Sequence, residues 1–361
     1  AAVDDETGRR SEENNTMVAR AIEPMLAVAW RDLKDVDGRL PFEHGHYLKM
    51  WELDQPHIGA GVVLFDEAQD VSPVMASIVY QQAGHAQLVL VGDSNQQIYG
   101  WMGAVDALDS FKCDRRTSLT KSFRFGPAIA DVANRALEML PTDMRMVGFE
   151  QIDSRIETLK DQDCTLCRTN AQAVSVVMSA IADGRRPHLV GGGEQVLRFA
   201  RAAQDLQDGR RTSHRDLACF ETWSEVQEYV EEDPQGGELK LLVDIIDDFG
   251  ADRLVQALKK MPSEQNADIV VSTAHRSKGR QWSSVRLAGD FPSDLAKVPE
   301  EEMRLLYVAV TRARQVLDAS AVPWLIEGVD GEDSEGAVDA MIEEALGERR
   351  VEIADLYRLS S

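Results

Sequence analysis

The chain has 361 residues, 43% of them hydrophobic and 28% charged, a composition that excludes wholesale disorder and collagen-like repeats. At about 150 residues per domain, this length predicts two or three domains. The 39 Lys and Arg side chains against 62 Asp and Glu give a formal net charge of −23, which taken alone argues against a nucleic-acid partner. Much of the acid falls in two blocks, residues 215–268 and 318–361, each with a net charge of −9. The rest of the chain is nearly neutral, so a local basic or stacking groove stays open there.

The first forty residues are polar and predict helix and loop. The first twenty contain no apolar signal-peptide core, and no predominantly apolar run of about 20 residues predicts a membrane span. Only four cysteines are present, which fits a reducing cytoplasm. The chain does not begin with Met, so we expect a fragment or a processed chain.

Short β-branched runs and amphipathic stretches alternate from residue 61 onward. The expected strands cover residues 61–65 (a buried parallel strand), 87–93, 118–122 (a weaker signal), 165–169, 187–192, 268–274, 284–290 and 315–321. The expected helices cover residues 127–140, 171–183, 194–206, 221–260, 300–313 and, after a linker at 330–336, residues 337–346. This alternation predicts the α/β class with parallel sheets.

Cys164 and Cys167 form one C-x-x-C pair. No second ligand pair follows at zinc spacing, so we interpret these thiols as core residues rather than metal or redox groups.

Asp66 and Glu67 directly follow the first predicted strand. A carboxylate at the C-terminal end of a parallel strand faces the crevice where ligands bind. Asp66 in that place suits Mg²⁺, and Glu67 suits the abstraction of a proton from water. The two residues alone are also compatible with a solvated acidic turn.

The second strand leads into the segment VGDSNQQIYGWMGA. Its Gln96 places a polar amide where a phosphate oxygen can sit. Tyr99 and Trp101 lie two residues apart among glycines, a spacing that suits base stacking on exposed aromatics. The alternative is that both rings belong to the core under a loop.

Arg124 follows the weak strand and is flanked by Phe123 and Phe125, a pattern that suits a phosphate clamp beside a stacking ring. Arg312 ends an apolar-faced helix, where an isolated arginine is usually solvated. A small basic cluster in STAHRSKGRQW suits a nucleic-acid backbone. Its members are His275, Arg276, Lys278 and Arg280.

In this order, the segments DEAQD, GDSNQQIYGWMGA, SFRF, STAHRSKG and YVAVTRAR resemble the superfamily 1 DNA helicases of the UvrD/Rep type. The resemblance runs from Asp66 to Arg314. STAHRSKGRQW and the short insert between Arg124 and Val270 are similar to the F-box DNA helicase branch. Such helicases are P-loop NTPases with two RecA-like lobes, which bind ATP between them and move 3′ to 5′ along single-stranded DNA.

The resemblance implies ATP and Mg²⁺ as cofactors and single-stranded DNA as partner, with no membrane involved. On the nucleotide side it implies that Asp66 is the metal carboxylate, Glu67 the catalytic base and Gln96 the γ-phosphate sensor. It also implies that Phe123 stacks on adenine, that Arg124 and Arg312 are arginine fingers, and that Gln281 contacts the ribose. At the last of these the family usually has Glu. On the DNA side it implies Tyr99, Trp101, His275, Arg276 and Lys278.

The sequence contains no G-x-x-x-x-G-K-[ST] loop, which in such enzymes cradles the phosphates. We therefore expect an incomplete first lobe over residues 1–115, a second lobe over 116–325 with a small helical insert at about 205–265, and an acidic tail over 326–361. We also expect the lone chain to hydrolyse ATP poorly. The alternatives are a nucleotide-independent DNA-binding or adaptor protein, and one subunit of a split helicase whose P-loop lies on a partner chain or an upstream segment. The adaptor reading predicts decay of Glu67, Arg124 and Arg312, and all three are present.

Overall fold

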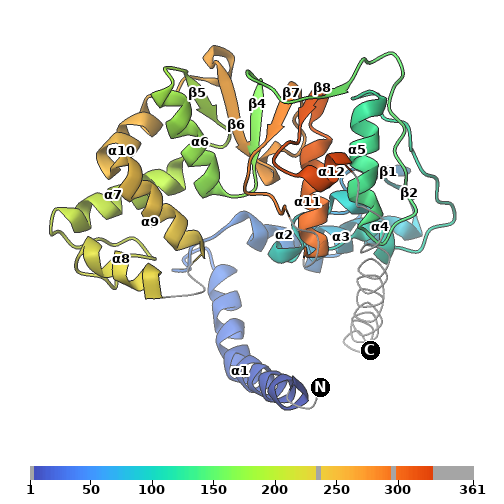
Figure 1. Cartoon of the computed structure of the whole chain (residues 1–361). Helices are drawn as coiled ribbons and strands as arrows, with labels where there is room; N and C mark the ends of the chain where they lie inside the picture. The colour runs from blue at the N-terminus through green and yellow to red at the C-terminus, as the bar shows by residue number, and fades with distance from the viewer. Residues whose placement is uncertain (1–3, 233–236, 294–297, 328–361) are drawn as a thin grey trace. The chain divides into compact units, whose positions relative to one another are not determined.

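A computed structural model of the chain describes residues 4–232, 237–293 and 298–327, and Figure 1 colours them along the sequence. The chain forms two compact units. Unit 1 comprises the residues up to Asp93 together with Tyr99–Lys112. Unit 2 comprises Ser94–Ile98 and the chain from Cys113 onward. The predicted linker at 330–336 and helix at 337–346 lie outside the described residues.

Unit 1 is built around a two-stranded parallel sheet, in which Val62 lies opposite Gln87 and Phe65 opposite Leu90. Ser72 caps the helix that follows the first strand by accepting the N–H of Met75. A small buried cluster of Ala68, Val71, Ala76 and Ala107 lies against this sheet. The elements in order are α1 (Asp4–Leu33), α2 (His44–Leu53), β1 (Val62–Phe65), α3 (Pro73–Tyr80), β2 (Gln87–Leu90) and α4 (Ala107–Ser110).

The prediction that residues 61–65 form a parallel strand is confirmed, but the prediction that the strand is buried is wrong. The side chain of Leu64 is 75% exposed and that of Val62 is 51% exposed. Within the described residues this sheet has only the strands β1 and β2, so its apolar side chains have few partners. The β-branched residues therefore predicted the strand correctly, whereas the burial of its side chains depends on how many other elements pack against the sheet.

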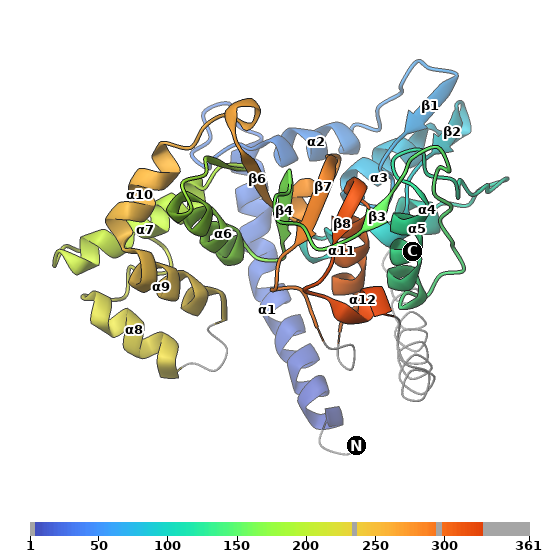
Figure 2. The same cartoon turned by 45° about the horizontal axis from the view of Figure 1, so that its top comes forward.

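Unit 2 contains a six-stranded sheet in which every neighbouring pair is parallel, in the order β3-β8-β7-β4-β6-β5 (Figures 1 and 2). Its strands are β3 (Arg155–Ile156), β4 (Cys164–Cys167), β5 (Pro187–Leu189), β6 (Ile269–Thr273), β7 (Trp282–Leu287) and β8 (Ala313–Asp318). Together with the intervening helices these strands confirm the predicted α/β class. The predicted strand at 118–122 is wrong: only an isolated bridge from Lys121 to Val147 forms there.

The helices of unit 2 cover the sheet in two groups. Helices α5 (Pro127–Glu138) and α11 (Glu300–Val310) pack on each other and on β8, while α6 (Asn170–Ala182) packs on β4, β5 and β6. Short α12 (Pro323–Glu327) is held at α5, where Arg135 donates to the carbonyl oxygens of Leu325 and Ile326.

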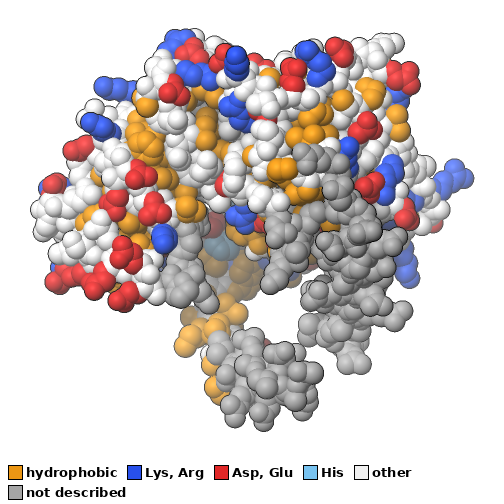
Figure 3. Space-filling model, in the orientation of Figure 1, with side chains coloured by type: hydrophobic (Ala, Val, Ile, Leu, Met, Phe, Trp, Pro, Cys, Tyr) orange, Lys and Arg blue, Asp and Glu red, His pale blue; other side chains and the backbone are white. Residues whose placement is uncertain are grey.

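The predicted acidic helical stretch at 221–260 forms three helices: α8 (Trp223–Glu232), α9 (Gly237–Phe249) and α10 (Ala251–Lys259). They pack with α7 (Glu194–Gln207) around a shared apolar core. The indole N–H of Trp223 donates to Asp247 Oδ1 at 2.8 Å and ties α8 to α9. Asp and Glu side chains gather on the surface of this region in Figure 3.

Cys164 and Cys167 lie fully buried on β4. Burial raises the pKa of both thiols well above the usual range, which disfavours the thiolate needed for metal or redox chemistry. Their interpretation as core residues is confirmed. In the part of the chain that the structure describes, no group of His, Cys, Asp and Glu is arranged to hold a metal ion, and no helix there has the length and apolarity to cross a bilayer.

Candidate functional site

The first predicted pair of carboxylates lies in unit 1, at the C-terminal end of β1. Asp66 and Glu67 are both exposed. Glu67 has a positive φ of 55°, a backbone conformation that is uncommon for residues other than glycine and often marks functional sites. Its N–H donates to Asp66 Oδ1 at 2.9 Å, so the two carboxylates are held by one tight turn.

A buried amide that sequence reasoning missed holds Glu67 in place. Gln69 is 1% exposed. Its Nε2 donates to Glu67 Oε2 at 2.7 Å, and its Oε1 accepts the N–H of Asp93 at 3.1 Å. Gly92 permits this contact, since a Cβ there would lie 2.3 Å from Gln69 Oε1. Glutamine is mostly exposed in proteins, so the Gln inside DEAQD gave no sign in the sequence that it would be buried and hydrogen-bonded here.

The two predicted stacking aromatics also belong to unit 1. Trp101 lies on a 3₁₀ turn, Gly100–Met102, and is 68% exposed. Tyr99 is half-buried, and its N–H donates to Asp70 Oδ1 at 3.2 Å. The alternative that Trp101 is a core residue is therefore excluded, and its ring is free to meet a flat ligand.

Gln96 lies on a different 3₁₀ turn, Ser94–Gln96, which belongs to unit 2. Its Oε1 accepts Arg312 Nη2 at 3.4 Å, and its carbonyl oxygen accepts Lys278 Nζ at 3.4 Å. The neighbouring Gln97 accepts Arg304 Nη1 at 3.5 Å. This short segment is thus anchored to unit 2 by three cationic side chains.

Arg312 differs from the solvated helix arginine that is common at such positions, because it is only 1% exposed. It follows α11, where its Nε donates to the carbonyl oxygen of Val308 at 2.8 Å and its Nη2 to Thr311 Oγ1 at 2.8 Å. Arg124 reaches the same place, with Nη1 donating to the carbonyl oxygen of Thr311 at 3.2 Å. The structure therefore brings Arg124 and Arg312 together at Thr311, and Gln96 accepts a hydrogen bond from Arg312.

Phe123 and Phe125 point to different surroundings. Phe125 is 1% exposed and anchors the loop, while Phe123 is 70% exposed. The ring of Phe123 meets Phe149 edge-on, with centroids 5.1 Å apart. An exposed ring next to Arg124 suits stacking on a planar base.

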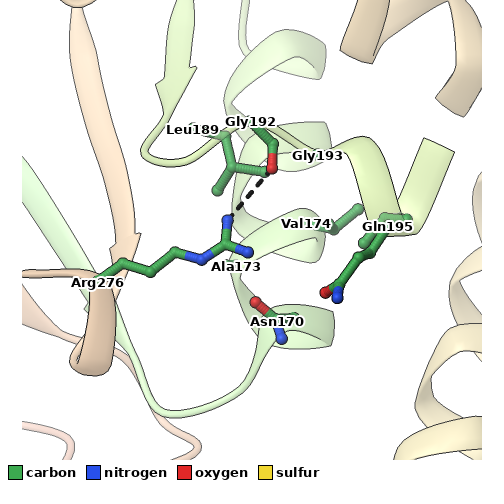
Figure 4. Close-up of a pocket in the computed structure, with 9 residues that line it drawn as sticks. Asn170, Ala173, Val174, Leu189, Gly192, Gly193, Gln195 and Arg276 are labelled. Atoms are coloured by element: carbon green, nitrogen blue, oxygen red, sulfur yellow. Dashed lines mark hydrogen bonds between the residues drawn. The ribbon is translucent and has the colours of Figure 1, made fainter. Parts of the chain in front are cut away.

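The basic cluster after β6 divides between two sites. Lys278 contacts Gln96, as described above, whereas Arg276 Nη1 donates to the carbonyl oxygen of Val190 at 3.1 Å and to that of Gly192 at 3.2 Å. Figure 4 shows the second of these bonds. Half-buried His275 lies on the 3₁₀ turn that starts this segment. Gln281, the predicted ribose contact, is exposed immediately before β7.

Two known domain families match stretches of this sequence. Residues 55–113 match the UvrD/REP helicase N-terminal domain, and residues 149–322 match the UvrD-like helicase C-terminal domain. The chain belongs to the UvrD-like helicase family. The first match of this UvrD-like chain holds Asp66, Glu67, Gln96 and Trp101. The second holds the basic cluster and Arg312, while Arg124 and Phe123 lie between the two matched ranges.

Relatives of this UvrD-like helicase chain are similar over most of its length. F-box DNA helicase protein 1 of Schizosaccharomyces pombe is 29% identical over 322 residues, which cover 76% of this chain and 37% of the relative. F-box DNA helicase 1 of Gallus gallus is 28% identical, covering 80% and 32%. ATP-dependent DNA helicase UvrD2 of Mycobacterium tuberculosis is 26% identical, covering 74% and 47%. The chain thus spans 32% to 47% of the length of these relatives.

Proposed function

We propose that this chain carries the water-activating, γ-phosphate-contacting and DNA-contacting parts of an ATP-dependent helicase that moves 3′ to 5′ on single-stranded DNA. The observation that carries the proposal is the loop from Ser94 to Met102. Its first part, with Gln96, is anchored on Arg312 and Lys278. Trp101 lies only five residues further along the chain and is exposed. A change at the nucleotide side would therefore reach the stacking ring through a few residues of backbone.

On the hydrolysis side, Glu67 would accept a proton from the attacking water, and Gln69 would keep the carboxylate oriented. Asp66 would hold Mg²⁺, which commonly takes one or two protein carboxylates besides phosphate and water. That ion, when bound, neutralises charge on the phosphates. Asp66 is exposed and offers one carboxylate beside Glu67. This suits a Mg²⁺ ion shared with phosphate and water better than one enclosed by protein ligands alone.

Arg124 and Arg312 would neutralise the charge that develops on the γ-phosphoryl group. Both guanidinium groups already converge on Thr311. Phe123, exposed beside Arg124, would stack on adenine, and Gln281 would contact the ribose. Gln96 would report the presence of the γ-phosphate, since it competes with phosphate oxygens for the donors of Arg312.

The printed sequence has no G-x-x-x-x-G-K-[ST] loop. The proposal therefore assigns the cradle for the phosphates to another segment or chain. A phosphate-release assay with single-stranded DNA tests this, run on the chain alone and on the chain mixed with a polypeptide that carries a P-loop and its strand. We expect turnover near background for the chain alone and DNA-stimulated turnover for the mixture.

Glu67→Gln should abolish that turnover, while the exposed Glu150→Gln serves as the matched control. Duplexes with a 3′ or a 5′ single-stranded tail then test direction, with unwinding expected only from the 3′ tail. DNA binding that never responds to ATP in the mixture would favour the adaptor alternative. Turnover that survives Glu67→Gln would contradict the assigned base.

A further inference from the structure

Unit 2 contains a groove whose lining includes none of the residues given a role above. It runs along α7 and is closed by the segment that follows this helix and by the start of α9. Its polar lining is cationic and hydroxylated, and comes mainly from Arg198, Arg201, Thr212, Ser213, His214 and Arg215. Leu239 and Leu242 lie at its apolar side.

One of the two carboxylates in this groove already has a cationic partner, since Asp205 Oδ1 accepts Arg210 Nη2 at 2.9 Å. The other, Asp216, is 61% exposed, and its Oδ2 lies 3.9 Å from His214 Nδ1. Arg198 faces Glu194 at 3.6 Å, but both side chains are more than half exposed, so that pair is weak. Arg201 and Arg215 are exposed, and neither forms an ion pair with any residue that the structure describes. The groove therefore offers guanidinium groups to a ligand.

Residues 198–215, which supply the arginines of the groove and are called the basic strip below, differ in charge from the sequence that follows them. Residues 198–215 contain five arginines and two aspartates, whereas residues 216–252 contain twelve acidic side chains and a single basic one. A cationic strip beside an acidic helical region predicts a polyanionic ligand that keeps to the strip.

The groove is continuous with the predicted DNA contacts. Asn170, Gln195 and Val196 line both this groove and the smaller pocket that holds Arg276. In that pocket Arg276 donates to the carbonyl oxygen of Gly192, with Asn170 and Gln195 on the facing side (Figure 4). Gly191 has a φ of +80°, and a Cβ there would lie 2.6 Å from Arg276 Nη1, so a side chain at this position would disturb the arginine.

We propose that this groove binds the phosphate backbone of single-stranded DNA and extends the track that starts at His275 and Arg276. The proposal rests on the proposed function, because it takes its ligand from there. From Gln195 to Asp205, α7 rises by about 15 Å, which matches about four phosphates of a stacked strand at about 3.4 Å each. Guanidinium groups on both walls would then hold the strand without reading its sequence.

The experiment compares Arg201→Ala/Arg215→Ala with the unchanged full chain by fluorescence anisotropy on a labelled oligothymidine, over a series of salt concentrations. Loss of two phosphate contacts should lower the log–log salt slope by about 1.4 and weaken binding about 10- to 25-fold at about 0.1 M salt. The matched control is Arg155→Ala/Arg253→Ala, which removes two exposed arginines of the same unit outside the groove and should bind as the unchanged chain does. Thermal unfolding of all three proteins checks that folding is equal.

The outcomes separate this proposal from the proposed function. If Trp101→Ala weakens binding while the groove variant binds as the unchanged chain does, the groove proposal fails and the DNA-binding function stands. If the unchanged chain does not bind the oligonucleotide at all, both fail. If polyglutamate binds the unchanged chain but not the groove variant, and DNA binding does not differ between them, the groove takes an acidic peptide and the proposal is overturned.

Discussion

Aromatic residues close together in this chain differ sharply in exposure. The buried rings hold a loop in place, whereas the exposed ones are available to contact a ligand. Phe125 is 1% exposed and Phe123 70%, although one residue lies between them. Trp101 is likewise 68% exposed on its turn. Large exposed rings cost solvation free energy, so each of them is a candidate contact for a flat ligand.

Trp101→Ala should weaken single-stranded DNA binding at least several-fold, because one base stacked on an aromatic ring contributes about 1–3 kcal/mol. The free energy of unfolding should change little, since the ring is mostly exposed. Anisotropy titration of a short oligonucleotide measures the first quantity and urea unfolding the second. Trp51→Ala is the matched control, because Trp51 is also partly exposed, at 44%, but lies on α2. Equal affinity of Trp101→Ala and the unchanged chain would refute the stacking role.

Residues whose role depends on local chemistry could be predicted from the sequence, and residues whose role depends on packing could not. The Asp66–Glu67 pair was found because acidic residues after a β-branched run are a local signal. The burial of Gln69 and Arg312 depends on elements far along the chain, so nothing beside them in the sequence indicates it. That is also why Arg312 looked like a solvated charge by its position alone.

Elements were predicted best where a β-branched run met a helix-forming run. The predicted strands of unit 2 overlap β4 to β8, in which most side chains are buried, although β7 and β8 each begin two residues earlier than predicted. The weak run at 118–122 has no neighbouring strand to pair with except at Lys121, so it remains a loop. Sheet order came only from the structure, because parallel neighbours such as β4 and β6 are about a hundred residues apart.

The burial of strand β4 should divide the four thiols of the chain into two that react slowly and two that react quickly. Cys164 and Cys167 are buried with raised pKa values, whereas Cys113 and Cys219 are exposed. DTNB should therefore react quickly with two thiols of the folded chain, and with all four after denaturation in urea. Cys113→Ser/Cys219→Ser should abolish the fast phase and leave the slow one. A fast reaction that persists in this double variant would show that β4 is accessible.

Strand β8 ends in a buried carboxylate that should make unit 2 sensitive to acid. Burial alone would raise the pKa of Asp318, but hydrogen bonds from Ser320, the N–H of Leu159 and Arg286 outweigh it, so the pKa lies below its usual value of 3.8. A carboxyl with a lowered pKa in the folded state stabilises the fold above its unfolded-state pKa. That stability is lost as the pH falls through the folded-state pKa.

Asp318→Asn should lower the free energy of unfolding at neutral pH by about 1–3 kcal/mol, because Arg286 and two N–H groups lose their charged acceptor. The loss relative to the unchanged chain should shrink as the pH falls from about 4 through the lower folded-state pKa of Asp318, below which the carboxyl of the unchanged chain is protonated as well. Urea unfolding at a series of pH values measures both effects. Asp161→Asn is the control, since the Asp161 side chain is 88% exposed and its substitution should leave the free energy of unfolding almost unchanged. An equal loss at every pH would mean that packing, not charge, is responsible.

On the scale of the whole molecule, the charge opposes the proposed substrate. The net charge is −23, yet the groups proposed to meet DNA are arginines, a lysine, a histidine and aromatic rings. The acidic side chains gather instead over the helical region of α8 and α9 (Figure 3) and in the C-terminal block. Such separation lets a local basic track bind a polyanion while the rest of the surface repels it and limits unspecific binding.

Removal of residues 329–361 should therefore leave single-stranded DNA affinity equal or raise it. This segment contains ten acidic and three basic side chains, so its loss lowers the negative charge that repels phosphates. The gain should be largest at low salt and vanish at high salt, since repulsion between separated charges is screened over about 10 Å at about 0.1 M. Anisotropy titrations of the full and shortened chains across a salt series measure this. A second variant keeps the full length but has an uncharged Gly-Ser segment in place of these residues, and it separates the effect of charge from that of chain length. It should bind as the shortened chain does. Weaker binding by either variant would mean that the acidic segment lies on the DNA path or supports the DNA-binding surface.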